Sequence, residues 1–197
     1  MPGVGLDKGV RYRFLLYAAL CYVPLAMALG VGAWRQGTLS KPLWPAFMLL
    51  GILGWTLIEY LLHRGLLHYR AEVATIQKVI EKLHLGHHWD PLDEAKIIVP
   101  VYASLPIAGA LLGLFRLMAG SWEAAALLMT GTITGYLYYE LVHFRIHRGS
   151  RRGRCLKWQR ANHLCHHYKD QDRCFGVTTP LWDWVFGTRR VRSKVLA

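Results

Sequence analysis

Four long stretches with very few charged residues constrain the fold of this chain most strongly. They cover residues 14–34, 42–62, 97–118 and 122–142. Each is close to the roughly 20 residues that a helix needs to cross the hydrocarbon core of a bilayer. A content of 53% hydrophobic and only 18% charged residues is also unusual for a soluble protein of this size. We therefore expect residues 1–197 to form one all-α integral membrane domain with these four transmembrane helices.

The basic residues predict which side of the membrane each loop occupies. Loops rich in Lys and Arg stay in the cytoplasm. With four spans, the opposite side receives only Arg35, Lys41 and Arg116. The other side receives twelve basic residues after His147, together with Lys8, Arg11, Arg13, Arg64, Arg70, Lys78, Lys82, Lys96 and Arg145. We expect both termini and a helical cap, formed by residues 63–96 and 143–197, to be cytoplasmic. The membrane would be the bacterial inner membrane or the endoplasmic reticulum.

A net charge of +12 could also indicate binding to nucleic acid, because basic patches attract phosphates. The positive-inside rule explains the same charges without such a partner. We therefore expect no nucleic-acid partner.

All ten histidines fall into four short groups, each of which follows or lies between the apolar stretches. The groups are HxxxxH (His63, His68), HxxHH (His84, His87, His88), HxxxH (His143, His147) and HxxHH (His163, His166, His167). Residues three and four apart share one face of a helix, so each HxxHH group can present three imidazoles in one direction. His63 and His68, five apart, diverge on an ideal α-helix and need either different metals or a local break near Gly65.

Clustered imidazoles are typical metal ligands. Ten of them exceed what one ion accepts, so we expect two metal ions with about five nitrogens each. Iron, zinc, copper and nickel all accept imidazole, and the spacing does not choose among them. Glu59 and Glu140 are acids near the ends of apolar stretches, where a charge is costly, and we expect them to orient the ligand imidazoles.

The order HxxxxH, HxxHH, HxxxH, HxxHH resembles the fatty acid hydroxylase and sterol desaturase superfamily of membrane di-iron enzymes. Three further segments look most like fatty acid 2-hydroxylases: Glu59-Tyr60-Leu61-Leu62-His63-Arg64, Gly135-Tyr136-Leu137-Tyr138-Tyr139-Glu140, and Phe175-Gly176-Val177 leading to Leu181-Trp182-Asp183 and Phe186-Gly187-Thr188. Arg148 stands where relatives often have a further histidine.

The resemblance implies two iron ions that use molecular oxygen to hydroxylate the acyl chain of a membrane lipid. It favours hydroxylation at carbon 2. It implies no catalytic side chains beyond the metal ligands. Zinc could replace iron in purified protein. Eukaryotic relatives often carry a fused cytochrome b5 domain, which we do not expect in these residues, because all ten histidines belong to the four groups. The resemblance therefore implies an external electron donor, such as a separate cytochrome b5 or ferredoxin.

Two alternatives remain open at this point. A sterol, carotenoid or other lipid hydroxylase or desaturase would share the metal core. A membrane metal-binding or transport protein without redox chemistry would need histidines along a path through the bilayer, whereas here all ten are expected at one face.

Overall fold

The computed structural model describes residues 12–36, 43–149 and 153–190, and every regular element in these ranges is a helix. Of the residues named above, Lys8, Arg11 and Lys41 lie outside the described residues. The helices are α1 (Arg13–Arg35), α2 (Trp44–Leu61), η2 (Leu62–Leu67), α3 (Ala74–Ile80), η3 (Glu81–Leu85), α4 (Gly86–Trp89), α5 (Glu94–Ile97), α6 (Val101–Ala119), α7 (Trp122–Arg148), α8 (Arg154–Tyr168) and α9 (Leu181–Val185). The all-α prediction is confirmed.

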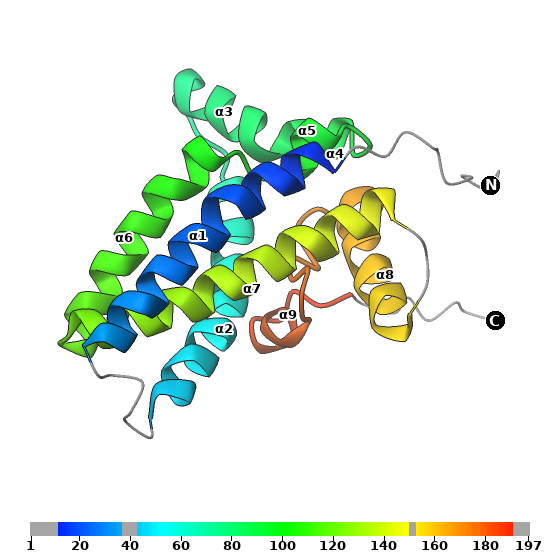
Figure 1. The fold of residues 1–197 in the computed structure, drawn as a ribbon. Coiled ribbons are helices and arrows are strands. Elements are labelled where there is room, and N and C mark those ends of the chain that lie inside the picture. The colour runs from blue at the N-terminus through cyan, green and yellow to red at the C-terminus, as the bar shows by residue number, and fades with distance from the viewer. Residues whose placement is uncertain (1–11, 37–42, 150–152, 191–197) are drawn as a thin grey trace.

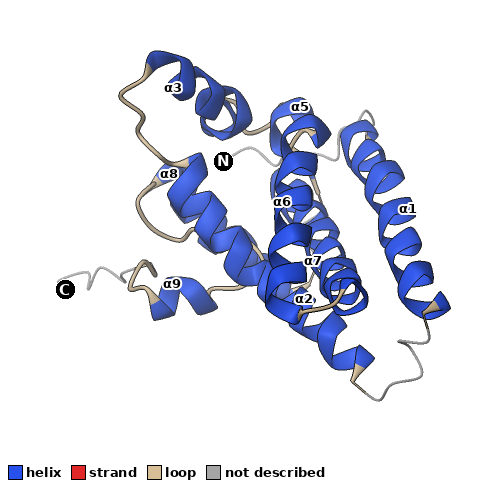
Figure 2. Cartoon of the chain, turned by 90° about the vertical axis from the view of Figure 1, so that its left-hand side faces the viewer, coloured by secondary structure: helices blue, strands red, loops and turns tan. Residues whose placement is uncertain are grey.

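Helix α7 is the centre of the fold. Helices α1, α2 and α6 all pack on it, and the shorter helices α3, α4, α5 and α8 gather toward one end (Figure 1). Seen from the side, α8 and α9 lie next to the bundle rather than inside it (Figure 2). The core where the long helices meet is largely aromatic, with Tyr22, Trp55, Tyr136 and Tyr139 in contact.

Helices α2 and α7 approach so closely that glycine is required at the crossing. A Cβ atom added at Gly51 would lie 2.1 Å from the Leu128 carbonyl oxygen, and one added at Gly131 would lie 2.1 Å from the Met48 carbonyl oxygen. Small residues at such crossings let helix backbones touch and are typical of membrane bundles.

Three segments are long and apolar enough to cross a membrane: Arg13–Arg35, Trp44–Leu67 and Glu94–Ala119. The fourth expected span coincides with α7, which is not among them. Its sequence is less apolar because three helices cover it, and most of its side chains are buried in protein. The fourth span and the cytoplasmic cap therefore stay predictions.

The ends of the third and fourth long helices follow from local features of the chain. The third long helix begins at Val101 rather than at residue 97, because Pro100 separates it from the short helix α5. Helix α7 begins after Gly120, which has a φ of +72°, and Ser121 caps it by accepting a hydrogen bond from the Ala124 amide. At its other end α7 continues to Arg148, so it carries both His143 and His147.

Candidate metal centre

A π-helical segment joins the first two histidines. In η2 the chain turns with i→i+5 hydrogen bonds, so residues five apart lie on one face, unlike in an α-helix. His63 and His68 therefore converge, with ring centroids 5.1 Å apart. The local break expected near Gly65 is thus a change of helix type, and both residues belong to one group. Single π-turns of this kind are frequent at functional sites.

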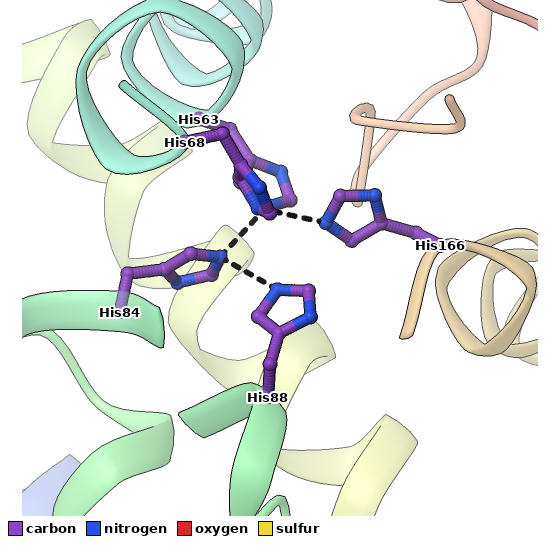
Figure 3. A group of neighbouring side chains, drawn as sticks. All are labelled: His63, His68, His84, His88 and His166. Carbon is purple, nitrogen blue, oxygen red and sulfur yellow. Dashed lines mark hydrogen bonds between the residues drawn. The ribbon is translucent and has the colours of Figure 1, made fainter. Parts of the chain in front are cut away.

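The first group contains five histidines that converge from three parts of the chain: His63, His68, His84, His88 and His166. Their available nitrogen atoms all lie within 4.8 Å of one another. Figure 3 shows the rings pointing inward from η2, from η3 and α4, and from α8. The Nε2–Nε2 distances are 2.9 Å for His63 and His84, 3.1 Å for His84 and His88, and 3.0 Å for His68 and His166.

The second group contains the other five histidines: His87, His143, His147, His163 and His167. Their nitrogen atoms also lie within 4.8 Å of one another. The Nε2 atom of His147 is 3.1 Å from that of His87 and 3.0 Å from that of His163. Both ring nitrogens of His143 and of His167 are buried without a hydrogen-bond partner among the described residues.

Each HxxHH motif contributes to both groups, which corrects the expectation that all three of its imidazoles face one way. Residues four apart stay together: His84 with His88, and His163 with His167. The middle histidine of each motif, His87 or His166, lies three residues after the first and belongs to the other group. The two motifs therefore link the two groups and fix the distance between them.

The electrostatics favour neutral imidazoles. Burial, followed by the neighbouring histidines, lowers the pKa of His84, His163 and His166 well below the usual value for histidine. Burial also lowers the pKa of His88 to about 3. A neutral ring has one lone pair and one N–H. The Nε2 atoms of His63 and His88 both lie within 3.1 Å of that of His84, so one N–H cannot satisfy them all, whereas a cation accepts every lone pair. The residues present therefore fit two metal ions.

Backbone carbonyls set the orientation of two rings in the first group. Because a carbonyl oxygen only accepts, His63 Nδ1 must donate to Phe175 (2.6 Å) and His166 Nδ1 must donate to Arg173 (2.8 Å). The proton on Nδ1 leaves Nε2 with its lone pair facing the group.

Glu59 acts on this arrangement through a loop rather than by touching a histidine. Its carboxylate accepts hydrogen bonds from the Val177 amide (2.6 Å), the Thr178 amide (2.9 Å) and the Thr178 hydroxyl (2.6 Å). These bonds fix the segment that presents the Phe175 carbonyl to His63. The hydrogen bonds of Glu140 likewise reach backbone, since its Oε1 accepts from the Val99 amide (3.1 Å).

Sequence reasoning missed Asp183, which completes the support of this loop. The side chain is fully buried and accepts from the Phe175 and Gly176 amides, both at 2.9 Å, and from the Thr188 hydroxyl at 2.8 Å. The family resemblance includes the segment Leu181-Trp182-Asp183, but it does not indicate a role for Asp183. Only the fold shows that α9 places this side chain against the loop.

An almost wholly apolar pocket leads away from the first histidine group. His63, Glu59 and Tyr139 line it near the histidines, and Leu111 and Met129 line it deeper in the bundle. Helices α2, α6 and α7 supply most of its wall, whose other members are Tyr22, Trp55, Leu62, Leu66, Leu67, Leu83, Val99, Ala103, Ser104, Ile107, Ala108, Thr132, Ile133 and Tyr136. Its shape and lining suit a hydrocarbon chain.

Comparisons with known proteins agree with this geometry. The family model for fatty acid hydroxylase matches residues 48–188. A dihydroceramide fatty acyl 2-hydroxylase of Arabidopsis thaliana (FAH2) is 36% identical over 138 residues, which are 70% of this chain and 58% of that protein. Human fatty acid 2-hydroxylase is 32% identical, covering 93% of this chain and 54% of that protein. The chain thus spans little more than half the length of these relatives.

A solved structure has the same fold. The hydroxylase domain seen in full-length scs7p superimposes with a TM-score of 0.82 at 27% sequence identity, covering 93% of this chain and 69% of that one. Because the family model covers well over half of the sequence, including every histidine group, this chain belongs to the fatty acid hydroxylase family.

Proposed function

We propose that this protein is an oxygen-dependent di-iron hydroxylase that acts on the fatty acyl chain of a membrane lipid, at carbon 2. The observation that carries the proposal is the position of His63, which belongs to the first histidine group and also lines the apolar pocket. A chain in that pocket would present a carbon to the metals. The relatives that are named as fatty acid 2-hydroxylases support the choice of carbon 2.

The ten histidines would hold the two metals, five in each group. Iron supplies the activation of oxygen that attack on an unreactive C–H bond requires. The chain's own residues bind and orient: the Phe175 and Arg173 carbonyls keep His63 and His166 in the ligating tautomer. The apolar wall excludes water from the reacting carbon, and no side-chain acid or base is needed. Zinc also accepts imidazole and could occupy the same sites in purified protein.

We also propose that α7 is a fourth span and that the histidine-bearing end of the bundle is cytoplasmic, where a separate electron donor can reach it. The distribution of Lys and Arg in the sequence supports this orientation. In a variant whose four native cysteines are replaced, a cysteine introduced at Lys169, an exposed position just after α8, is expected to react with a membrane-impermeant thiol reagent only after the cytoplasmic side is opened.

Mass spectrometry of lipids from cells with and without the gene tests the reaction itself. We expect 2-hydroxylated acyl chains to accumulate only with the gene. Acyl chains oxidised at another carbon would contradict 2-hydroxylation. Hydroxylated sterols or carotenoids would indicate one of the alternative substrates instead.

Filling the deep end of the pocket should change which chains are accepted. Met129→Trp adds bulk opposite the histidine end, so we expect hydroxylation of long acyl chains to fall relative to short ones. Met118→Trp is the matched control, because Met118 is exposed on α6 and outside the pocket. A competition assay with a mixture of chain lengths measures the ratio. An unchanged ratio would show that the chain does not occupy this pocket.

Glu59→Gln should weaken metal binding without removing a ligand. The glutamine side chain has an NH2 group in place of one accepting oxygen. This group cannot accept the hydrogen bond that Val177 or Thr178 donates to Glu59. Loss of such support around metal ligands costs about 10- to 100-fold in affinity. Titration with a chelator of known affinity measures the change, and Glu72→Gln, at an exposed position, serves as the control. Equal affinities for both variants would contradict the role given to Glu59.

A further inference from the structure

The two histidine groups differ in their access to solvent. All five members of the second group are buried, with at most 8% of any residue exposed. In the first group His63, His84, His88 and His166 are buried too, whereas His68 is only partly buried. His68 is thus the most exposed of the ten histidines.

His68 also lines a second pocket, which shares no residue with the apolar pocket. The residues of η2 alternate between the two: Leu62, His63, Leu66 and Leu67 line the apolar pocket, while Arg64, Gly65 and His68 line the second. The rest of the second pocket consists of Tyr60, Leu61, Tyr69, Arg70 and Phe186. Arg64, Gly65, Tyr69 and Arg70 are all exposed, so this pocket is open to solvent beside His68.

His68 is also more weakly anchored than His63 and His166. It follows the last residue of η2, and exposed Tyr69 and Arg70 come directly after it. Its Nε2 atom faces that of His166 at 3.0 Å, but no backbone carbonyl holds its Nδ1 in the described part of the chain, as carbonyls hold His63 and His166. The ring can therefore turn away without unwinding a helix.

The second group has no comparable member. Four of its histidines lie within α7 and α8, the two longest helices of this region, and the fifth, His87, lies in α4 and is 1% exposed. Displacing any of these rings requires a local opening of packed helices, which is slower than rotation of a partly exposed side chain.

We propose that the pocket lined by Arg64, Gly65, His68 and Arg70 is a metal-exchange port, with His68 as its movable ligand. The first metal enters and leaves through this port, and the second is sealed behind helices and exchanges much more slowly. This inference rests on the proposed two-metal site.

Chelation of the purified, metal-loaded protein tests the port. After EDTA is added, samples are desalted at intervals and their metal content is measured by elemental mass spectrometry. We expect two phases of equal amplitude, with one metal ion per chain released rapidly and the other slowly. Release of both ions in a single phase would overturn the inference.

Gly65→Phe should close the port. A Cβ atom at Gly65 meets no atom within 4 Å, so the ring can be accommodated and would fill the pocket beside His68. We expect the rapid phase to slow by about tenfold, because release would then need a local opening of the chain. Gly54→Phe on α2 is the matched control, since Gly54 is equally free of neighbours and lies outside both pockets. A wild-type rapid phase in Gly65→Phe would count against the port.

His68→Ala gives an answer even if Gly65→Phe does not fold. We expect this variant to be purified with one metal ion per chain, and that ion to leave at the slow wild-type rate. Rapid loss of the remaining ion would contradict the separation of the two sites. Wild-type protein that binds fewer than two ions at saturation would instead refute the two-metal proposal, so the two failures are distinguishable.

Discussion

Replacing His163 by alanine is expected to reduce hydroxylation below detection and to lower the metal content of the purified protein from about two ions to about one per chain. His163 is fully buried on α8, and its Nε2 atom lies 3.0 Å from that of His147. The alanine variant removes one of the five nitrogens of the second group. The first group keeps all five of its own, so one ion should remain bound.

Lys157→Ala is the matched control for this experiment. Lys157 lies on the same helix at an exposed position, two turns before His163. The control should keep both ions and full activity, as measured by elemental analysis and by product formation in the same membranes. Two retained ions in His163→Ala would remove His163 from the ligand set.

Gly131→Leu is expected to prevent formation of the folded bundle. The added Cβ atom alone would lie 2.1 Å from the Met48 carbonyl oxygen and 3.1 Å from the Cα atom of Gly51, so the two backbones would have to separate. Overpacking of a core typically costs about 1–3 kcal/mol, and here two backbones rather than flexible side chains must move. Helix α7 carries His143 and His147 of the second group, and η2, which continues directly from α2, carries His63 of the first, so separation of α2 and α7 would also disrupt the metal sites.

The result can be read from size-exclusion profiles and thermal unfolding in detergent. Gly113→Leu on α6 is the control, because a Cβ atom there meets nothing within 4 Å. We expect Gly131→Leu to aggregate or to unfold at a much lower temperature than the control. Equal stability of the two variants would show that α2 and α7 do not cross at these glycines.

The fold was predictable where one physical requirement dominates the sequence. Long apolar stretches indicated the long helices, and the histidine spacing indicated ten converging rings. The α7 span illustrates the limit: its Glu123 and Glu140 and its glycines and threonines reflect packing against three other helices, so its hydropathy alone does not identify a membrane segment.

The details of the site depended on features that the sequence does not display. The spacing of His63 and His68 leaves two outcomes open, and the π-helical turn of η2 decides between them. The division of each HxxHH motif between two groups follows from the placement of α4 and α8 on opposite sides of the site. The roles of Glu59 and Asp183 depend on a loop from Phe175 to Thr178 that lies more than a hundred residues from Glu59.

The metal content of protein loaded with iron under anaerobic conditions tests the central claim most directly. Two iron ions per chain are expected for the wild-type protein, bound by the two groups of five histidines. Saturation at one ion per chain, or no specific binding at all, would contradict a di-iron centre and with it the proposed hydroxylation.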